Sequence, residues 1–204
     1  MSLSETITRA PIILASNSVA RRQLLEGAGV SFESCAALVD ERAIEAELEV
    51  SGPGEVAEAL SRAKALAVSR QRPTALVIGA DQTLALGAHI FHKSASRQAA
   101  RTVLATLRGQ THRLYSGIAV AQAGEILDAH VAVASLSMRG FSDAFLDSYL
   151  DQVGDEVTQS VGCYQLEGPG IQLFERIEGD YFTILGLPLL PLLAFLRSIG
   201  RLDD

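Results

Sequence analysis

Residues 11–25 read PIILASNSVARRQLL, and this stretch decides the fold that we expect. Residues 12–15 form a short, wholly apolar run that is typical of a buried strand. Leu24, Leu25 and Ala28 follow at helical spacing, before glycines end the pattern. A buried strand therefore passes directly into a helix, as in α/β proteins.

The joint between this strand and this helix is polar. Ser16, Asn17 and Ser18 are residue types that cap a helix start, where free backbone N–H groups and the positive end of the helix dipole point to one place. Arg21 and Arg22 follow in the first turn, where a cation is unfavourable unless an anion lies nearby. The joint indicates either a phosphate site or two arginines that are simply solvated.

Composition is that of a globular protein. The chain has 204 residues, of which 48% are hydrophobic and 20% are charged, so it can bury a large core. We expect one α/β domain over residues 1–204. The net charge of −7 argues against a large nucleic-acid footprint but leaves room for a small anionic ligand in a basic pocket.

Cysteine use and hydropathy favour the cytoplasm. Cys35 and Cys163 are the two cysteines and lack CxxC spacing, so we expect reduced, structural thiols. No apolar run reaches the ~18–20 residues that span a bilayer. The first ten residues, MSLSETITRA, lack the basic-then-apolar pattern of a signal peptide. We therefore expect a cytoplasmic protein without a membrane partner.

Further elements alternate along the chain. Residues 55–70 show the apolar spacing of an amphipathic helix, and residues 74–78 form a β-branched strand that we expect to end before Asp81. A carboxylate just past a buried strand lies where α/β folds place their chemistry. Residues 111–121 and 126–136 are two long strands joined by a glycine turn, so the sheet should be mixed.

Turn-forming residues and hydrophobic periodicity predict the other elements. We expect a strand at 30–33, a loop at 51–54, helices at 96–107 and 141–149, a glycine-rich loop at 162–170, a strand at 171–177 and a closing helix at 189–199. We expect Ser142 to cap the helix at 141–149.

Polar residues that suit chemistry gather at the ends of these elements: Ser16, Ser18, Arg21, Glu41, Lys64, Asp81, Gln82, Lys93 and Glu167. Such a mixture suits a metal-assisted phosphate site, in which Mg²⁺ takes one or two carboxylates and cations balance the phosphate charge. Walker A, GxGxxG, HExxH and GxSxG patterns are missing. The structural alternatives are a loop-capping Asp81, a solvated Glu41, and surface lysines at 64 and 93.

Several motifs stand in a telling order: LASNSVARRQLL at 14–25, VDE at 39–41, AKA at 63–65, IGADQ at 78–82, Lys93, RGQTH at 108–112 and GLPL at 186–189. With them the chain resembles the Maf-type nucleoside triphosphate pyrophosphatases over nearly its whole length. The resemblance implies hydrolysis of the α–β phosphate bond of a nucleotide, with Mg²⁺ or Mn²⁺, to a monophosphate and diphosphate. It also implies a fold similar to that of the inosine triphosphate pyrophosphatases: an elongated mixed β-sheet flanked by helices, in two lobes with a cleft.

The resemblance further implies roles for single residues. Asp81 is expected to be the proton acceptor that primes a water, and Glu41 and Asp81 are expected to hold the metal. The substrate phosphates are expected to be bound by Ser16, Ser18, Arg21, Lys64 and Lys93. A homodimer is common in the resembled family, so we expect one here, with a small-molecule nucleotide as substrate.

Three positions bear on substrate choice: Ala20, Gln82 and Glu167. The branch of the resembled family that acts on dTTP and UTP usually has Arg, Thr and Gln at these places, whereas Gln82 and Glu167 are similar to the 7-methyl-GTP branch. A carboxylate accepts both N1–H and N2–H₂ of guanine and favours the positive charge of N7 methylation. Because Ala20 brings no ring, stacking on the base is left to Phe174 or Tyr164.

Departures and alternatives complete the prediction. Val19, Ser94 and the run Gly162-Cys163-Tyr164 stand where the resembled family usually has Pro, Pro and Ala-Gly before an aromatic residue. Our leading interpretation is a house-cleaning pyrophosphatase for 7-methyl-GTP or other modified nucleotides. The alternatives are a dTTP/UTP pyrophosphatase, or a nucleotide-binding regulator of cell division, at the septum, without turnover.

Overall fold

A mixed β-sheet organises the fold in this computed structural model, which describes residues 10–48 and 52–203. Its strands are β1 (Ile12–Ala15), β2 (Glu33–Ser34), β3 (Leu76–Leu86), β4 (His89–Phe91), β5 (Thr111–Gln122), β6 (Glu125–Met138) and β7 (Phe174–Glu178). Their order is β2-β1-β3-β5-β6-β7, with β4 paired to β3. β1 runs parallel to β2 and β3, whereas β4 and β7 pair antiparallel with β3 and β6. The expected mixed α/β sheet is confirmed.

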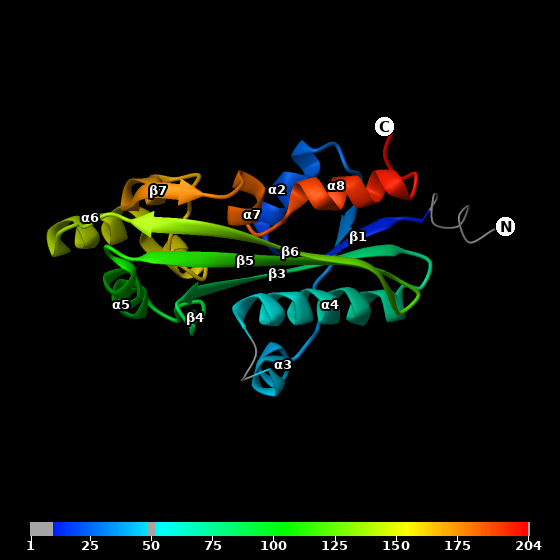
Figure 1. Cartoon of the computed structure of the whole chain (residues 1–204), viewed down its shortest axis with the longest axis horizontal. Helices are drawn as coiled ribbons and strands as arrows, with labels where there is room; N and C mark the ends of the chain where they lie inside the picture. Colours follow the sequence, from blue (N-terminus) through cyan, green and yellow to red (C-terminus); the bar gives the residue numbers. More distant parts are fainter. Residues whose placement is uncertain (1–9, 49–51, 204) are drawn as a thin grey trace. The chain divides into compact units, whose positions relative to one another are not determined.

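Helices flank this sheet (Figure 1). They are α2 (Val19–Gly27), α3 (Glu41–Glu47), α4 (Pro53–Gln71), α5 (Arg97–Leu107), α6 (Asp143–Val153), α7 (Tyr181–Ile184) and α8 (Leu189–Ser198). Two short 3₁₀ helices, η1 (Gly154–Thr158) and η2 (Pro169–Leu173), lie between α6 and β7 in the chain. Within residues 10–48 and 52–203, none of the helices combines the length and hydropathy that crossing a membrane requires.

The chain divides into two compact units. The first takes Met1–Asp81, Ser116–Ala132 and Tyr181–Asp204, and the second takes Gln82–Tyr115 and Val133–Asp180. The strands β3, β5 and β6 therefore contribute residues to both units. The two units correspond to the two expected lobes, while the cleft between lobes, the elongated outline and the single domain over 1–204 stay predictions.

Helices cover both faces of the sheet in the first unit, because side chains alternate along β1. Leu14 lies in one apolar cluster with Leu25 of α2 and Leu192 of α8. Ile13 lies in a different cluster with Val68 of α4. Figure 1 accordingly shows α2 and α8 on one side of β1 and α4 on the other. The strand–helix joint predicted from residues 11–25 is thus confirmed, with both elements buried where expected.

α4 lies close to the sheet because two strand residues lack a side chain. A Cβ on Gly79 of β3 would lie 2.2 Å from the carbonyl oxygen of Ser61, and one on Gly117 of β5 would lie 2.5 Å from that of Ala57. Both distances are shorter than van der Waals contact, so these two places require glycine. The close approach brings Lys64, one turn beyond Ser61, within reach of β3.

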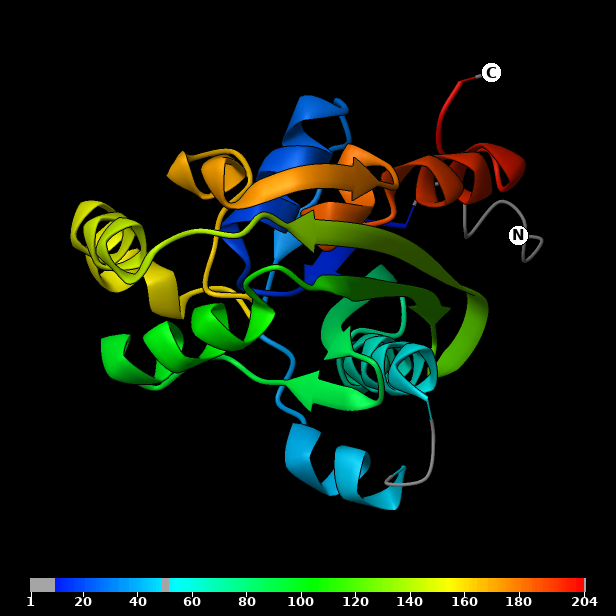
Figure 2. The same cartoon turned by 60° about the vertical axis from the view of Figure 1, so that its left-hand side comes forward.

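The second unit contains α5 and α6, which pack beside each other (Figure 2). Both helices have serine caps: Ser142 accepts a hydrogen bond from the N–H of Phe145, as expected, and Ser96 does the same for Ala99. Exposed ion pairs link the two helices, such as Arg101 with Asp147 at 2.7 Å. Exposed ion pairs of this kind add little stability, so we attribute the stability of the two helices mainly to their caps and their apolar faces.

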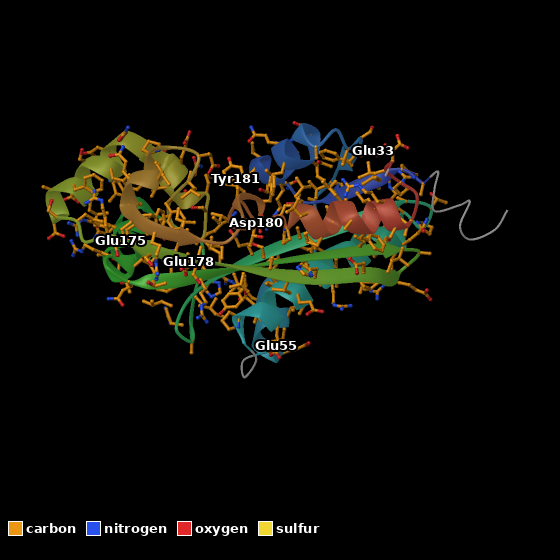
Figure 3. All side chains as sticks on the ribbon, turned by 45° about the horizontal axis from the view of Figure 1, so that its top comes forward. Glu33, Glu55, Glu175, Glu178, Asp180 and Tyr181 are labelled. Carbon is orange, nitrogen blue, oxygen red and sulfur yellow. The ribbon has the colours of Figure 1, made fainter. Side chains whose placement is uncertain are left out.

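The start of α4 corrects the expected loop at residues 51–54. The helix begins at Pro53, because the fixed φ of proline suits the first helical position. Glu55, labelled in Figure 3, also caps this start, since its carboxylate accepts a hydrogen bond from the N–H of Gly52 at 2.9 Å. Ser51 lies outside the described residues.

Three strands also differ from expectation. β2 occupies Glu33–Ser34 rather than residues 30–33. β7 begins at Phe174, because the three residues before it are wound into η2; Glu175 and Glu178 lie on this strand, both exposed (Figure 3). β3 runs on to Leu86 instead of ending at residue 78, because β4 pairs with its second half.

Candidate active site

The start of α2 is held by two serine hydroxyls. Ser18 caps the helix, and its Oγ accepts a hydrogen bond from the N–H of Arg21 at 3.4 Å. Ser16 Oγ accepts a hydrogen bond from the N–H of Ser18 at 3.2 Å and another from Arg21 Nη1 at 3.3 Å. Both hydroxyls therefore fix the joint between β1 and α2, as the sequence predicted for a helix start.

Arg21 is bound to the backbone on two sides. Its Nε donates to the carbonyl of Gly186 at 2.8 Å, and its Nη1 donates to the carbonyl of Ala80 at 2.7 Å. Burial lowers the pKa of the guanidinium, and the carboxylates of Asp81 and Glu41 act in the opposite direction. An arginine keeps its proton in proteins, so the charge remains.

These contacts decide between the two interpretations of the arginine pair. Arg21 is not solvated, since carbonyl oxygens and the hydroxyl of Ser16 satisfy its Nε and Nη1, whereas Arg22 is exposed. Within the described part of the chain, Nη2 of Arg21 has no hydrogen-bond partner. The guanidinium is therefore fixed at Nε and Nη1, and binding of an anion at its other end stays a prediction.

Lys64 joins the two candidate metal carboxylates. Its Nζ lies 2.5 Å from Asp81 Oδ1 and 2.7 Å from Glu41 Oε1. The side chains of Lys64 and Asp81 are each 12% exposed, while that of Glu41 is 52% exposed. A carboxylate so far from water needs a charged partner, and the ammonium of Lys64 provides it. Glu41 reaches the same ammonium from the first turn of α3.

The position of Asp81 corrects the expectation that it follows a strand end. It lies in the middle of β3, after the segment that pairs with β1, which ends at Ala15↔Gly79, and before the segment that pairs with β4 from Leu84. The carbonyl of Ala80, just beyond the last residue of β3 paired with β1, accepts a hydrogen bond from Arg21. Asp81 is thus held on a rigid strand at the point where its parallel neighbour stops.

The chemistry of these donors fits a magnesium ion that arrives with its substrate. Among the described residues, no three His, Cys, Asp or Glu side chains gather as a metal cluster. Mg²⁺ does not need one, because it keeps several waters and binds through one or two carboxylates together with substrate phosphates. Glu41 and Asp81, which share the ammonium of Lys64, would be the two carboxylates for such an ion.

Four predicted site residues remain: Ala20, Gln82, Lys93 and Glu167. Ala20 is half-buried in the first turn of α2. Gln82, Lys93 and Glu167 belong to the second unit: Gln82 follows Asp81 on β3, and the other two are exposed. Ser16, Ser18, Arg21, Glu41, Lys64 and Asp81 are all in the first unit and are connected by the contacts above. That all ten share one pocket stays a prediction.

Base stacking was left to Phe174 or Tyr164, and the structure does not favour Tyr164. Its ring is buried, packs edge-to-face on Phe174 with centroids 4.8 Å apart, and its hydroxyl bonds to His112 Nε2 at 2.7 Å. The two cysteines are free thiols as expected, with Cys163 buried and Cys35 half-buried.

Sequence reasoning missed the carbonyl oxygens that hold Arg21, because a backbone acceptor has no residue-type signal.

The sequence is similar to a family of known proteins. A family model described as Maf-like protein matches residues 11–199. The chain belongs to this family. It is 56% identical over 190 residues to a nucleoside triphosphate pyrophosphatase of Bradyrhizobium diazoefficiens, with 93% of this chain and 94% of that protein covered.

Two further relatives carry a more specific name. The chain is 54% identical over 194 residues to a 7-methyl-GTP pyrophosphatase of Rhizobium johnstonii. It is 52% identical over 194 residues to a protein of the same name from Brucella abortus. Each alignment covers 94% of this chain and 98% of the relative. The family expected from the motifs is confirmed.

Proposed function

We propose that this Maf-like protein is a nucleoside triphosphate pyrophosphatase, with 7-methyl-GTP or another modified nucleotide as its substrate. It hydrolyses the α–β phosphate bond and releases a nucleoside monophosphate and diphosphate. The observation that carries the proposal is the contact of Lys64 with both Asp81 and Glu41. Asp81 directly follows Ala80, whose carbonyl anchors Arg21. The names of the relatives agree with it.

Asp81 is the proton acceptor in this mechanism. Lys64 holds its Oδ1, and we assign the other carboxylate oxygen, Oδ2, to the water. As that water attacks phosphorus, its proton passes to Asp81 and the P–O bond to the diphosphate breaks. Glu41 and Asp81 would hold a divalent metal ion, which would supply Lewis acidity to lower the pKa of the water and positive charge to balance the phosphates.

Arg21 binds the phosphate chain in this mechanism. Its guanidinium is fixed by Gly186 and Ala80 before a substrate arrives, so little rotamer entropy is lost on binding. Nη2 and the backbone N–H groups at the start of α2 can both donate to phosphate oxygens. Ser16 and Ser18 keep that helix start in place, and Lys64 and Lys93 add positive charge.

The base is recognised by the carboxylate of Glu167 together with Gln82. Glu167 offers two acceptor oxygens to N1–H and N2–H₂ of guanine, and its charge favours a base that is methylated on N7. Its exposure leaves the carboxylate accessible to a ligand. The relatives named 7-methyl-GTP pyrophosphatase support this choice over dTTP and UTP.

Location and assembly belong to the same proposal. We place the enzyme in the cytoplasm, where a nucleotide-cleaning activity meets its substrates, and we expect a homodimer. Two free thiols and a net charge of −7 agree with a reducing compartment and a small-molecule substrate rather than a nucleic acid.

The test is diphosphate release from 7-methyl-GTP, GTP, dTTP and UTP with Mg²⁺ or Mn²⁺. Wild type should prefer 7-methyl-GTP, and Asp81→Asn should lose roughly 10²- to 10⁴-fold in rate, the usual contribution of a general base. Asp128→Asn, on β6, is the matched control and should keep full activity. Nucleotide binding without release from any substrate would instead favour the regulator of cell division.

Base preference has a test of its own. Glu167→Gln should lower turnover of 7-methyl-GTP relative to UTP, because an amide offers one acceptor where the carboxylate offers two and lacks its charge. Better turnover of dTTP and UTP than of 7-methyl-GTP by the wild type would establish the pyrimidine alternative.

A further inference from the structure

Cys163 has a backbone conformation that is rare for its residue type. Its φ is +59°, in the left-handed region, although it carries a Cβ. Its side chain is fully buried. Such a conformation costs free energy and persists only where the surroundings hold it. The contacts that hold Cys163 in this conformation therefore need to be identified.

Three groups hold Cys163 in place. Its Sγ lies 3.1 Å from Ser94 Oγ, its carbonyl accepts a hydrogen bond from the Tyr149 hydroxyl at 3.2 Å, and its N–H donates to the carbonyl of Ser160 at 3.3 Å. Burial raises the pKa of the thiol, so the Ser94 contact is one between neutral groups. Ser94 itself is buried, which makes this a contact shielded from water.

The contact joins two segments that are distant in sequence. Ser94 directly follows Lys93, the lysine assigned to the phosphates. Cys163 stands four residues before Glu167, the carboxylate assigned to the base. All four residues belong to the second unit, so their arrangement is internal to one compact body.

The chain between Cys163 and Glu167 is stiff enough to transmit that contact. Tyr164 is fixed by the His112 hydrogen bond, and both its N–H and its carbonyl bond to the hydroxyl of Ser160. Gln165 accepts a hydrogen bond from the N–H of Gly168 at 3.3 Å. A shift at Cys163 would therefore move the turn that carries Glu167 instead of being absorbed on the way.

We propose that Ser94 and Cys163 form a positioning pair that fixes the loop of Glu167 against the segment of Lys93, and so sets the preference for a purine over a pyrimidine nucleotide. The inference rests on the proposed function, because that assigns Lys93 and Glu167 to the substrate. Neither Ser94 nor Cys163 touches the substrate. Their effect is to keep the base-reading carboxylate and the phosphate-binding ammonium at a set separation.

The test compares Ser94→Ala, Cys163→Ala and the double variant with wild type. Titration calorimetry without divalent metal, so that hydrolysis does not consume the nucleotide, gives the Kd of 7-methyl-GTP and of UTP, and the ratio of the two measures preference. Each single variant should lower the preference roughly threefold to tenfold, the effect of losing one buried contact. The double variant should lose no more than a single one, because the two residues act through the same contact.

Rescue and matched controls separate positioning from mere packing. Cys163→Ser keeps a hydrogen-bonding group and should keep more of the preference than Cys163→Ala. Cys35→Ala, at the free cysteine of the first unit, should leave the ratio unchanged. Melting temperatures are measured for every variant. A fall in melting temperature with an unchanged Kd ratio would overturn the proposal, because packing alone would then explain the pair.

The wild type distinguishes this proposal from the proposed function. Binding of 7-methyl-GTP without diphosphate release would overturn the pyrophosphatase, while the Kd ratios would still decide the role of Ser94 and Cys163. A wild type that binds neither nucleotide would overturn both. An active wild type whose Kd ratio is the same in Ser94→Ala and Cys163→Ala would overturn the positioning pair alone.

Discussion

Lys64 Nζ lies 2.5 Å from Asp81 Oδ1, and this contact ties helix α4 to strand β3 at a place where both side chains are almost removed from water. The same ammonium holds Glu41 of α3 at 2.7 Å. One cation thus keeps two carboxylates together that would otherwise repel each other. Removing it should affect the stability of the fold and the geometry of the site at once.

Lys64→Met should lower the free energy of unfolding by about 3 kcal/mol, because breaking a buried ion pair leaves a carboxylate buried without a partner. Diphosphate release should fall with it. The control is Arg62→Met on the same helix, whose pair with Glu58 at 2.8 Å is about two-fifths exposed and should contribute no more than about 1 kcal/mol. Urea unfolding measures both variants, and equal losses would show that Asp81 does not depend on Lys64.

Arg21→Lys tests whether the guanidinium is needed for its shape. A lysine keeps the charge but cannot donate to Gly186 and Ala80 in the same geometry, so buried carbonyls are left unsatisfied at about 1–3 kcal/mol each. We expect weaker nucleotide binding and a lower midpoint of urea unfolding. Arg22→Lys, at the exposed neighbour, should change neither. A stable Arg21→Lys variant with full affinity would show that charge alone suffices.

Sequence alone predicts the parts of this fold whose signals are local. The joint from β1 to α2 has an apolar strand, a capping serine and helical spacing within fifteen residues, and each agrees with the structure. Ser96 and Ser142 mark helix starts for the same reason. The turn after β5 contains Ala123 and Gly124, both at positive φ, which suits a hairpin.

Elements that depend on distant partners were predicted less well. Gly79 and the polar residues after it gave the pattern of a strand end, yet β3 continues because β4 folds back onto it. Helix α3 (Glu41–Glu47) has no buried residue, so its sequence shows no apolar periodicity from which a helix could be predicted. Its contacts in the structure are polar: Asp40 caps its start, and Glu41 pairs with Lys64.

In the candidate site, the sequence likewise predicts the residues but not their contacts. Residue types pointed to Asp81, Glu41, Lys64 and Arg21, since charged groups at element ends are visible in a sequence. Their pairing was not visible, because it depends on how closely α4 approaches β3. That approach is set by Gly79, which has no functional group of its own.

Gly79→Ala should therefore disturb the site without touching a charged residue. The new Cβ would lie 2.2 Å from the carbonyl oxygen of Ser61 and 2.6 Å from the N of Ala65, so α4 must move away and take Lys64 with it. We expect a loss of about 3 kcal/mol in unfolding free energy, the upper part of the range for overpacking, and lower activity. Gly140→Ala, with open space around its Cβ, is the control. An unchanged unfolding curve for Gly79→Ala would contradict the close packing of α4.

His112 should make the protein sensitive to acid. Its ring is buried, Nε2 bonds to the Tyr164 hydroxyl, and Nδ1 has no partner among the described residues. Burial lowers the pKa of His112 to about 4 from 6.5. Between these two values the unfolded chain binds a proton that the folded chain does not, so stability falls as pH falls through this window.

The size of this effect follows from the shift. The loss approaches roughly 3 kcal/mol at pH 4 and vanishes above pH 6.5, where the ring is neutral in both states. Urea unfolding of wild type and of His112→Gln at several pH values isolates the contribution of His112, because the carboxylates titrate in both proteins. The difference between the two should shrink on acidification, whereas His130→Gln, at an exposed histidine of β6, should follow wild type. A constant difference from pH 7 to pH 4 would mean that the folded protein protonates His112 as readily as the unfolded chain does.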